Sequence, residues 1–181
     1  KVSLNVAGFF YSFQNFIYLS PSARFSSLPE AGKLFEYKQH NVIYAGGELN
    51  WSYRPLKFLV LTQAYEYVWN YNVETALPLP FTPPGSIFSE GRVHTDKLWI
   101  FEKAYLYLND HYVFAQNRVD RNEPQTPDYN LLNVGLGFDL KLTDKEKFVS
   151  SLQIRFSVQN LTNEQYFNHL SRYRWINVPE Q

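Results

Sequence analysis

The sequence predicts an all-β protein: an antiparallel up-and-down meander of about seven strands that forms part of a transmembrane β-barrel. Long stretches alternate apolar and polar residues with a period of two, as strands with one apolar and one polar face do. Phe, Tyr and Trp make up 18% of the chain, although its mean hydropathy is negative. Many rings combined with many polar residues suit barrel strands flanked by aromatic girdles. On composition alone, a soluble β-rich protein with a Tyr-rich core fits equally well.

The first half of the chain contains three predicted strands. Residues 4–19 are rich in β-branched and aromatic side chains, and a loop with Ser, Pro and Gly follows over residues 20–33. Residues 36–53 alternate clearly between two faces. A tight turn at residues 54–57 leads into the third strand, which extends to residue 71.

The middle of the chain adds two strands. The Pro-rich stretch over residues 76–85 cannot lie inside a β-ladder, because proline lacks the backbone donor. A weaker strand is predicted at residues 86–93, a short connection at 94–97 and a strand across 99–119. The spacing of Leu98, Phe101, Tyr105 and Leu108 would also suit a helix, but β-favouring residues dominate this segment.

The last two strands show the clearest alternation. Residues 130–142, "NLLNVGLGFDLKL", place an apolar residue at every second position. A turn is predicted at residues 143–147, then a seventh strand within 150–161, then a polar and aromatic tail over 162–181. This pattern leaves open whether the apolar face meets a protein core or lipid.

Loop lengths and strand lengths favour the membrane barrel. Long connections (20–34, 73–85 and 118–128) alternate with short ones (54–57, 94–97 and 143–147), as in outer-membrane barrels with short periplasmic turns and long extracellular loops. The strand over residues 57–72 would span roughly 50 Å at about 3.3 Å per residue, whereas soluble strands average about 5–6 residues. The charged residues of the predicted strands lie on the polar faces of those strands. Both a lipid environment and a soluble sheet would require this arrangement. These residues are Glu48, Glu66, Asp139, Lys141 and Arg155.

Composition and motifs make several function classes improbable. The formal net charge is zero, so the chain offers no electrostatic footprint for nucleic acid. It has no cysteine, which excludes disulfides and Cys-based metal or redox sites. It shows no phosphate loop, nucleophile elbow or zinc-helix motif, and the four histidines lack metal-ligand spacing. We therefore predict neither an enzyme nor a cofactor or metal site.

Seven strands cannot close a barrel alone. Bacterial single-chain barrels have even strand numbers, and each unpaired backbone group in lipid costs several kcal/mol. The sequence is therefore expected to be part of a larger barrel.

Four segments carry a family resemblance. They are "YAGGELNW" (44–51), "LPLPFTPP" (77–84), "TPDYNLLNVG" (126–135) and "VQNLTNEQYFNH" (158–169). In order and spacing they resemble the C-terminal part of a TonB-dependent receptor. Two departures are Phe81 and Gly85, at positions where the family commonly has arginine.

The resemblance implies a fold and a function. It implies that residues 1–181 are the C-terminal fragment of a 22-stranded barrel in the bacterial outer membrane, with the plug domain and the last strand absent. The whole receptor would bind a scarce nutrient outside the cell, such as an iron-siderophore, haem or another metal complex. It would import that ligand with energy from the TonB complex, contacted through the missing N-terminal region. Outer-membrane lipid would surround the barrel.

Two loop regions supply candidate ligand-binding residues. Arginines in an extracellular loop could hold an anionic siderophore by bidentate contacts, although a solvated loop with internal ion pairs would look the same. Aromatic residues of the final segment could line a ligand vestibule, form a girdle or cover a neighbouring loop, and an exposed loop histidine is the alternative for His169. The candidates are Arg118, Asp120, Arg121, Glu123, Tyr166, His169, Tyr173 and Trp175.

Two other functions stay open at this point. A passive, porin-like outer-membrane barrel would lack TonB coupling. A soluble β-sandwich could use its aromatic residues as a binding module, for example for carbohydrate.

Overall fold

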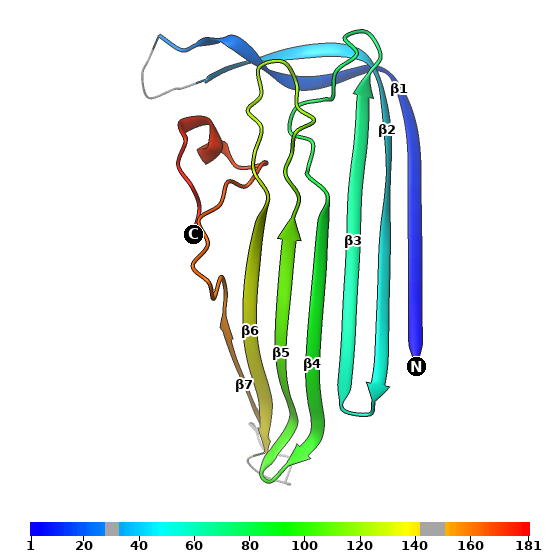
Figure 1. Ribbon diagram of the computed structural model, residues 1–181, viewed down its shortest axis with the longest axis vertical. Coiled ribbons are helices and arrows are strands. Elements are labelled where there is room, and N and C mark those ends of the chain that lie inside the picture. The colour runs from blue at the N-terminus through cyan, green and yellow to red at the C-terminus, as the bar shows by residue number, and fades with distance from the viewer. Residues whose placement is uncertain (28–32, 142–150) are drawn as a thin grey trace.

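The computed structural model describes residues 1–27, 33–141 and 151–181, which form one antiparallel sheet with its strands in chain order (Figure 1). The strands are β1 (Val2–Phe25), β2 (Lys33–Leu56), β3 (Leu59–Asn72), β4 (Ser86–Leu98), β5 (Phe101–Val113), β6 (Tyr129–Lys141) and β7 (Ser151–Val158). A short 3-10 helix, η2 (Arg172–Ile176), follows β7. The predicted seven-stranded meander is confirmed. No second sheet packs on it within the described residues, so the β-sandwich is excluded.

Most predicted segments are correct, but several connections were misplaced. The turn predicted at residues 54–57 lies later, because β2 extends to Leu56 and β3 begins at Leu59. Residues 20–25 continue β1 instead of forming a loop, because they pair with the first residues of β2. Residues 94–97 belong to β4, and the chain turns at Trp99 and Ile100. β5 ends at Val113, so the strand does not reach residue 119. The segment 96–108 is strand, not helix, and the predicted turn at 143–147 lies outside the described residues.

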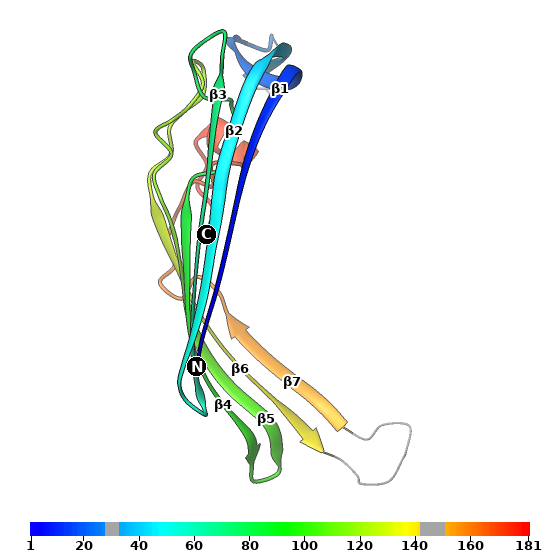
Figure 2. The same cartoon turned by 90° about the vertical axis from the view of Figure 1, so that its right-hand side faces the viewer.

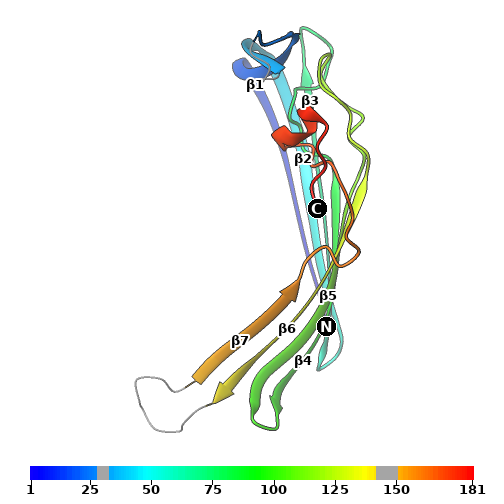
Figure 3. The same cartoon turned by 90° about the vertical axis from the view of Figure 1, so that its left-hand side faces the viewer.

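The sheet is one curved layer, and its two faces differ in chemistry (Figures 2 and 3). The segment after β7 lies on the concave side, where the Asn160 N–H donates to Asn133 Oδ1 (2.8 Å). Directly paired residues on neighbouring strands share a face, and side chains along one strand alternate between the two faces. Starting from Asn133, these two rules identify the other concave positions. Most are polar or small, and they include Ser3, Asn5, Glu48, Asn50, Glu66, Glu90, Arg92, Asn109, Asp139, Gln153 and Arg155.

The convex face is apolar and exposed. Its side chains include Val2, Leu4, Val6, Leu49, Val93, Leu106, Leu108, Leu136, Phe156 and Val158, all classed as exposed. Among the described residues only Val42, Leu79 and Val113 are buried apolar residues. A continuous apolar surface of this size requires an apolar environment around it. The sheet therefore has no core of its own to which the convex face could belong.

Some polar groups on the convex face are hydrogen-bonded to one another. Trp51 Nε1 donates to Gln63 Oε1 (2.9 Å), and Gln63 Nε2 donates to Ser89 Oγ (3.2 Å). Asp110 pairs with Ser89 across the β4–β5 ladder. The Trp51–Gln63–Ser89 bonds reduce the cost of placing polar groups on an otherwise apolar face.

Large rings on the concave face cover glycines of neighbouring strands. A Cβ atom at Gly135 would lie 2.5 Å from the Tyr107 ring. At Gly46 it would lie 2.5 Å from the Phe9 ring and 2.7 Å from the Tyr67 carbonyl oxygen. Glycine is required at these positions because the ring of the adjacent strand occupies the space of a side chain.

β1 and β2 extend beyond the rest of the sheet. The last residue of β3, Asn72, pairs with Val42, and past this point β1 and β2 pair only with each other. A bulge with Asn15 at φ 55° interrupts the ladder, and the Asn15 N–H donates to Asn41 Oδ1 (3.0 Å). Residues 16–25 and 33–40, the β1–β2 arm, bend across the loops at this end of the sheet (Figure 1). Bulges bend strands in this way.

Candidate functional site

A buried ion pair joins two loop segments beneath the β1–β2 arm. Glu123 lies in the connection between β5 and β6, and Arg174 lies in η2. Glu123 Oε1 and Arg174 Nη2 are 2.7 Å apart, and their side chains are 0% and 1% exposed. The Glu123 carboxylate also accepts the backbone N–H groups of Phe81 (2.8 Å) and Asp120 (3.2 Å). One carboxylate therefore fixes three segments far apart in sequence.

His169 completes this buried group, which we call the mouth cluster (Glu123, Thr126, His169 and Arg174). His169 Nε2 lies 3.3 Å from Glu123 Oε1, and His169 Nδ1 lies 3.0 Å from Thr126 Oγ1. Arg174 Nη1 also donates to the Pro124 carbonyl oxygen (3.3 Å). The C-terminal segment is thereby held against the β5–β6 connection by a buried network.

Aromatic rings enclose the Arg174 guanidinium and connect it to the arm. Its central carbon lies 5.3 Å from the Phe81 ring centroid and 4.7 Å from that of Trp175. The Phe35 ring, from the arm, is 5.8 Å from Phe81 and 5.4 Å from Trp175. Ser20, also in the arm, donates its hydroxyl to Asp120 Oδ2 (2.8 Å). The arm is therefore bound to the mouth cluster by stacking and by hydrogen bonds.

The electrostatics of the mouth cluster favour the charged form of Glu123. Burial raises the pKa of Glu123. Hydrogen bonds from His169, Arg174 and the Phe81 N–H, together with the Arg174 charge, lower the pKa by more than burial raises it. The pKa of Glu123 therefore lies below its ordinary value. Burial lowers the pKa of Arg174, and the Glu123 carboxylate opposes that shift.

This shift predicts acid sensitivity of the mouth cluster. Because the folded-state pKa of Glu123 is depressed, its contribution to stability is present above the ordinary glutamate value of about 4.3 and is lost as pH falls through the folded-state pKa. We expect hydrogen exchange of residues 166–180 to accelerate between pH 5 and pH 3, relative to intrinsic rates. Equal protection at both pH values would contradict this assignment.

The structure brings together some of the predicted site residues and separates others. Asp120, Glu123, His169 and Trp175 meet in or beside the mouth cluster, and His169 is 1% exposed, so the exposed loop histidine was the wrong alternative. Tyr166 stacks on Tyr129 (4.5 Å) and its backbone pairs with Glu180. Arg121 and Tyr173 are exposed at the loop end of the sheet. Arg118 lies on the convex side, where its guanidinium covers Trp69 (5.3 Å).

Sequence reasoning missed three members of this region. Arg174 is 51 residues from Glu123, and no local pattern links the two. Phe35 lay between the predicted loop (20–34) and the predicted strand (36–53) and was given no role. Phe81 was noted only as a departure from the resembled family, whereas its ring stacks on the Arg174 guanidinium.

A ladder of aromatic rings follows the concave face of β1. Successive ring centroids are 5.4–6.5 Å apart from Phe9 to Tyr18. The aromatic ladder consists of Phe9, Tyr11, Phe13, Phe16 and Tyr18. At its upper end the Tyr18 hydroxyl lies 2.9 Å from His40 Nδ1 and accepts a hydrogen bond from Asn72 Nδ2 (2.9 Å). Tyr11 and Phe13 are 54% and 39% exposed, so their rings are available for contact.

The described residues contain no metal-binding cluster. No group of three or more His, Cys, Asp or Glu side chains among them is arranged to hold a metal ion. None of their helices is long and apolar enough to cross a membrane. The chemistry offered by the described residues is therefore stacking, hydrogen bonding and charge at the loop end.

A curved sheet with a polar concave face, an exposed apolar convex face and long loops at one end defines the wall of an outer-membrane β-barrel. The family model described as "TonB dependent receptor-like, beta-barrel" matches residues 1–161. The chain belongs to this family of TonB-dependent receptors, which are bacterial outer-membrane proteins and not enzymes. The concave face is accordingly the lumen side, the convex face meets lipid, and the long loops are extracellular.

The comparison with solved structures agrees on the fold. The structure named "Copper transporter OprC" superposes with a TM-score of 0.78 at 18% sequence identity. The match covers 99% of this chain and 27% of that one, so the chain spans about a quarter of the solved structure. No curated protein matches the sequence.

Proposed function

We propose that residues 1–181 form the C-terminal part of a receptor barrel that binds a scarce nutrient outside the cell and imports it with TonB-supplied energy. The cargo classes are an iron-siderophore, haem or another metal complex. The observation that carries the proposal is the aromatic ladder, which leads from the extracellular mouth down the lumen face of β1. The family match supports TonB coupling over a passive barrel. The plug domain and the remaining strands belong to the rest of the receptor.

The chemistry of the wall supports recognition of an organic metal complex. The chain has no Cys or Met, the soft ligands that bind copper(I). The described residues also hold no group of three or more His, Cys, Asp or Glu side chains arranged to bind a bare ion. Exposed rings, in contrast, suit the flat or apolar surface of a chelator or porphyrin. The name of the similar structure, a copper transporter, is compatible with a metal-bearing cargo.

In this proposal, the residues at the extracellular mouth have two roles: some contact the ligand, and others hold the surrounding segments in position. Arg121 and Tyr173 are exposed and contact the arriving ligand directly. Glu123 and His169 are buried and hold the arm and the C-terminal segment in position. The indole Nε1 of Trp175 and the Nε of Arg174 are buried without an acceptor among the described residues, which leaves two donors for a ligand or a water molecule.

Removing two rings of the ladder tests the proposal. In the complete receptor, the Tyr11→Ala/Phe13→Ala double variant is expected to bind its ligand about tenfold or more weakly, since each ring contributes roughly 0.5–1.5 kcal/mol of stacking. Binding is measured by fluorescence quenching with ferric siderophores of the catecholate and hydroxamate classes, haemin and Cu²⁺.

Phe10→Ala is the matched control, because Phe10 lies on the lipid face of the same strand and is 67% exposed. The proposal fails if none of the probes binds the wild-type receptor. It also fails if the double variant binds a recognised probe as tightly as the Phe10→Ala control.

A further inference from the structure

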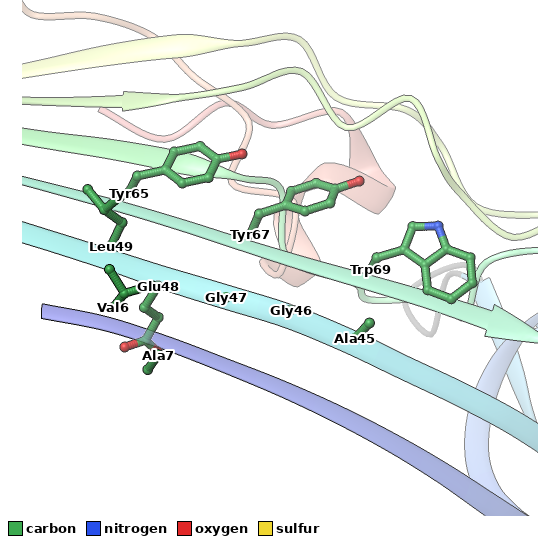
Figure 4. Close-up of a pocket in the computed structure, with 10 residues that line it drawn as sticks. All are labelled: Val6, Ala7, Ala45, Gly46, Gly47, Glu48, Leu49, Tyr65, Tyr67 and Trp69. Carbon is green, nitrogen blue, oxygen red and sulfur yellow. The ribbon is translucent and has the colours of Figure 1, made fainter.

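The lipid face carries an apolar groove along β2 (Figure 4). Its volume is about 420 Å³. Tyr65, Tyr67 and Trp69 of β3 follow one another along one side, and Val6 and Leu49 stand at the end nearest Tyr65, on the left of Figure 4. Because it opens on the face that meets lipid, the groove is accessible from the membrane and not from the lumen.

Gly47 of β2 lies in the floor of this groove, and Gly8 of β1 lies beside it. Gly8 and Gly47 are directly paired in the β1–β2 ladder, on the lipid-facing phase. A Cβ atom at Gly8 would meet nothing closer than the Gly46 carbonyl oxygen at 3.7 Å. At Gly47 the hollow therefore results from a missing side chain and not from a gap in the ladder.

A cation lies at the extracellular end of the groove. The Arg118 guanidinium covers the Trp69 ring (5.3 Å), and its Nη1 is 3.4 Å from the Tyr67 hydroxyl. Its Nη2 donates to the Asn70 carbonyl oxygen (3.0 Å), on the part of β3 that extends past the start of β4. A guanidinium has five N–H donors, and these contacts orient it beside the two aromatic residues that line the upper groove.

We propose that the groove and Arg118 form a specific binding site for a phosphorylated, acylated glycolipid of the lipid A class. One acyl chain lies on Gly47, where each buried CH₂ contributes about 0.8 kcal/mol relative to water. The phosphate lies at Arg118, which binds phosphate by charge-assisted, bidentate hydrogen bonds. The site is at the extracellular end of the barrel, where the outer leaflet contains this lipid class. Its occupancy is independent of the nutrient that the receptor imports.

Native mass spectrometry of the complete receptor in detergent tests the site, with diphosphorylated lipid A and phosphatidylglycerol as probes. Gly8→Leu places a bulky side chain beside Gly47, at the edge of the groove, without a backbone clash. Arg118→Gln removes the cation. Gly91→Leu is the matched control, because Gly91 is another lipid-facing glycine with open space, near only Leu61 at 3.7 Å. Mobility in unheated SDS gels reports whether each variant is folded.

We expect both site variants to bind lipid A at least tenfold more weakly, the control to bind it like the wild type, and phosphatidylglycerol to bind more weakly than lipid A. Unchanged binding by Arg118→Gln overturns the proposal, and so does an equal loss in Gly91→Leu, which indicates unspecific annular lipid. Equal binding of phosphatidylglycerol overturns the assignment to lipid A. If the Gly8→Leu variant does not fold, the binding of lipid A by the Arg118→Gln variant alone tests the proposal.

Discussion

Replacing Glu123 with alanine is expected to release the extracellular mouth while leaving the sheet intact. The substitution removes the carboxylate from Arg174, whose side chain is 1% exposed. Breaking a buried ion pair on one side costs about 3–5 kcal/mol, since an uncompensated charge stays buried. The backbone N–H groups of Phe81 and Asp120 lose their acceptor as well. Hydrogen exchange should therefore increase strongly in residues 33–40 and 166–180, and little in β3 to β6.

Glu164→Ala is the control for this prediction, because Glu164 lies in the same C-terminal segment and is exposed. Its exchange pattern should match that of the wild type. If the arm and the C-terminal segment are as well protected from hydrogen exchange in Glu123→Ala as in Glu164→Ala, the ion pair does not hold the mouth together.

Gly46→Val is expected to impair folding of the barrel. The new Cβ would lie 2.5 Å from the Phe9 ring and 2.7 Å from the Tyr67 carbonyl oxygen. The ring can rotate away, but the carbonyl belongs to the adjacent strand, so the backbone must shift. Overpacking of this kind costs typically 1–3 kcal/mol. The fraction of heat-modifiable, folded receptor in unheated SDS gels should fall.

Gly8→Val provides the comparison, since a Cβ there makes only an ordinary contact at 3.7 Å and valine favours strands. It should fold like the wild type. Equal yields of the folded form for both variants would show that ring-over-glycine packing on the lumen face is not required.

The alternation of the sequence predicted the sheet well for a physical reason. A strand with one lipid face and one lumen face has a period of two over its whole length, and β6 is the clearest case. The arm was missed because residues 20–25 contain Ser and Pro. Pro21 is nonetheless compatible with β1 because, among the described residues, β2 is the one strand that pairs with it. The turn at Trp99 and Ile100 was missed because it contains no Gly, Pro or Asn to mark it.

The mouth cluster could not be predicted from the sequence. Loop residues carry no periodicity, and the contacts of Glu123 with Phe81 and Arg174 span 42 and 51 residues. The sequence did identify Glu123, His169 and Trp175 as chemically notable. The sequence could not show that Glu123 and His169 are buried and hold the segments of the mouth together. Likewise, Arg118 stood among candidate ligand residues, and only the fold shows that it lies on the lipid side.

The central claim is that the convex face meets lipid and the concave face meets the lumen. Nitroxide scanning of β7 tests it directly, and the absence of cysteine from this chain simplifies labelling. Single cysteines at positions 153 to 158 of the reconstituted receptor are labelled, and their collision with dissolved oxygen is measured. We expect high oxygen accessibility at Ile154, Phe156 and Val158, and low accessibility at Gln153, Arg155 and Ser157. The opposite phase, or no alternation, would contradict it.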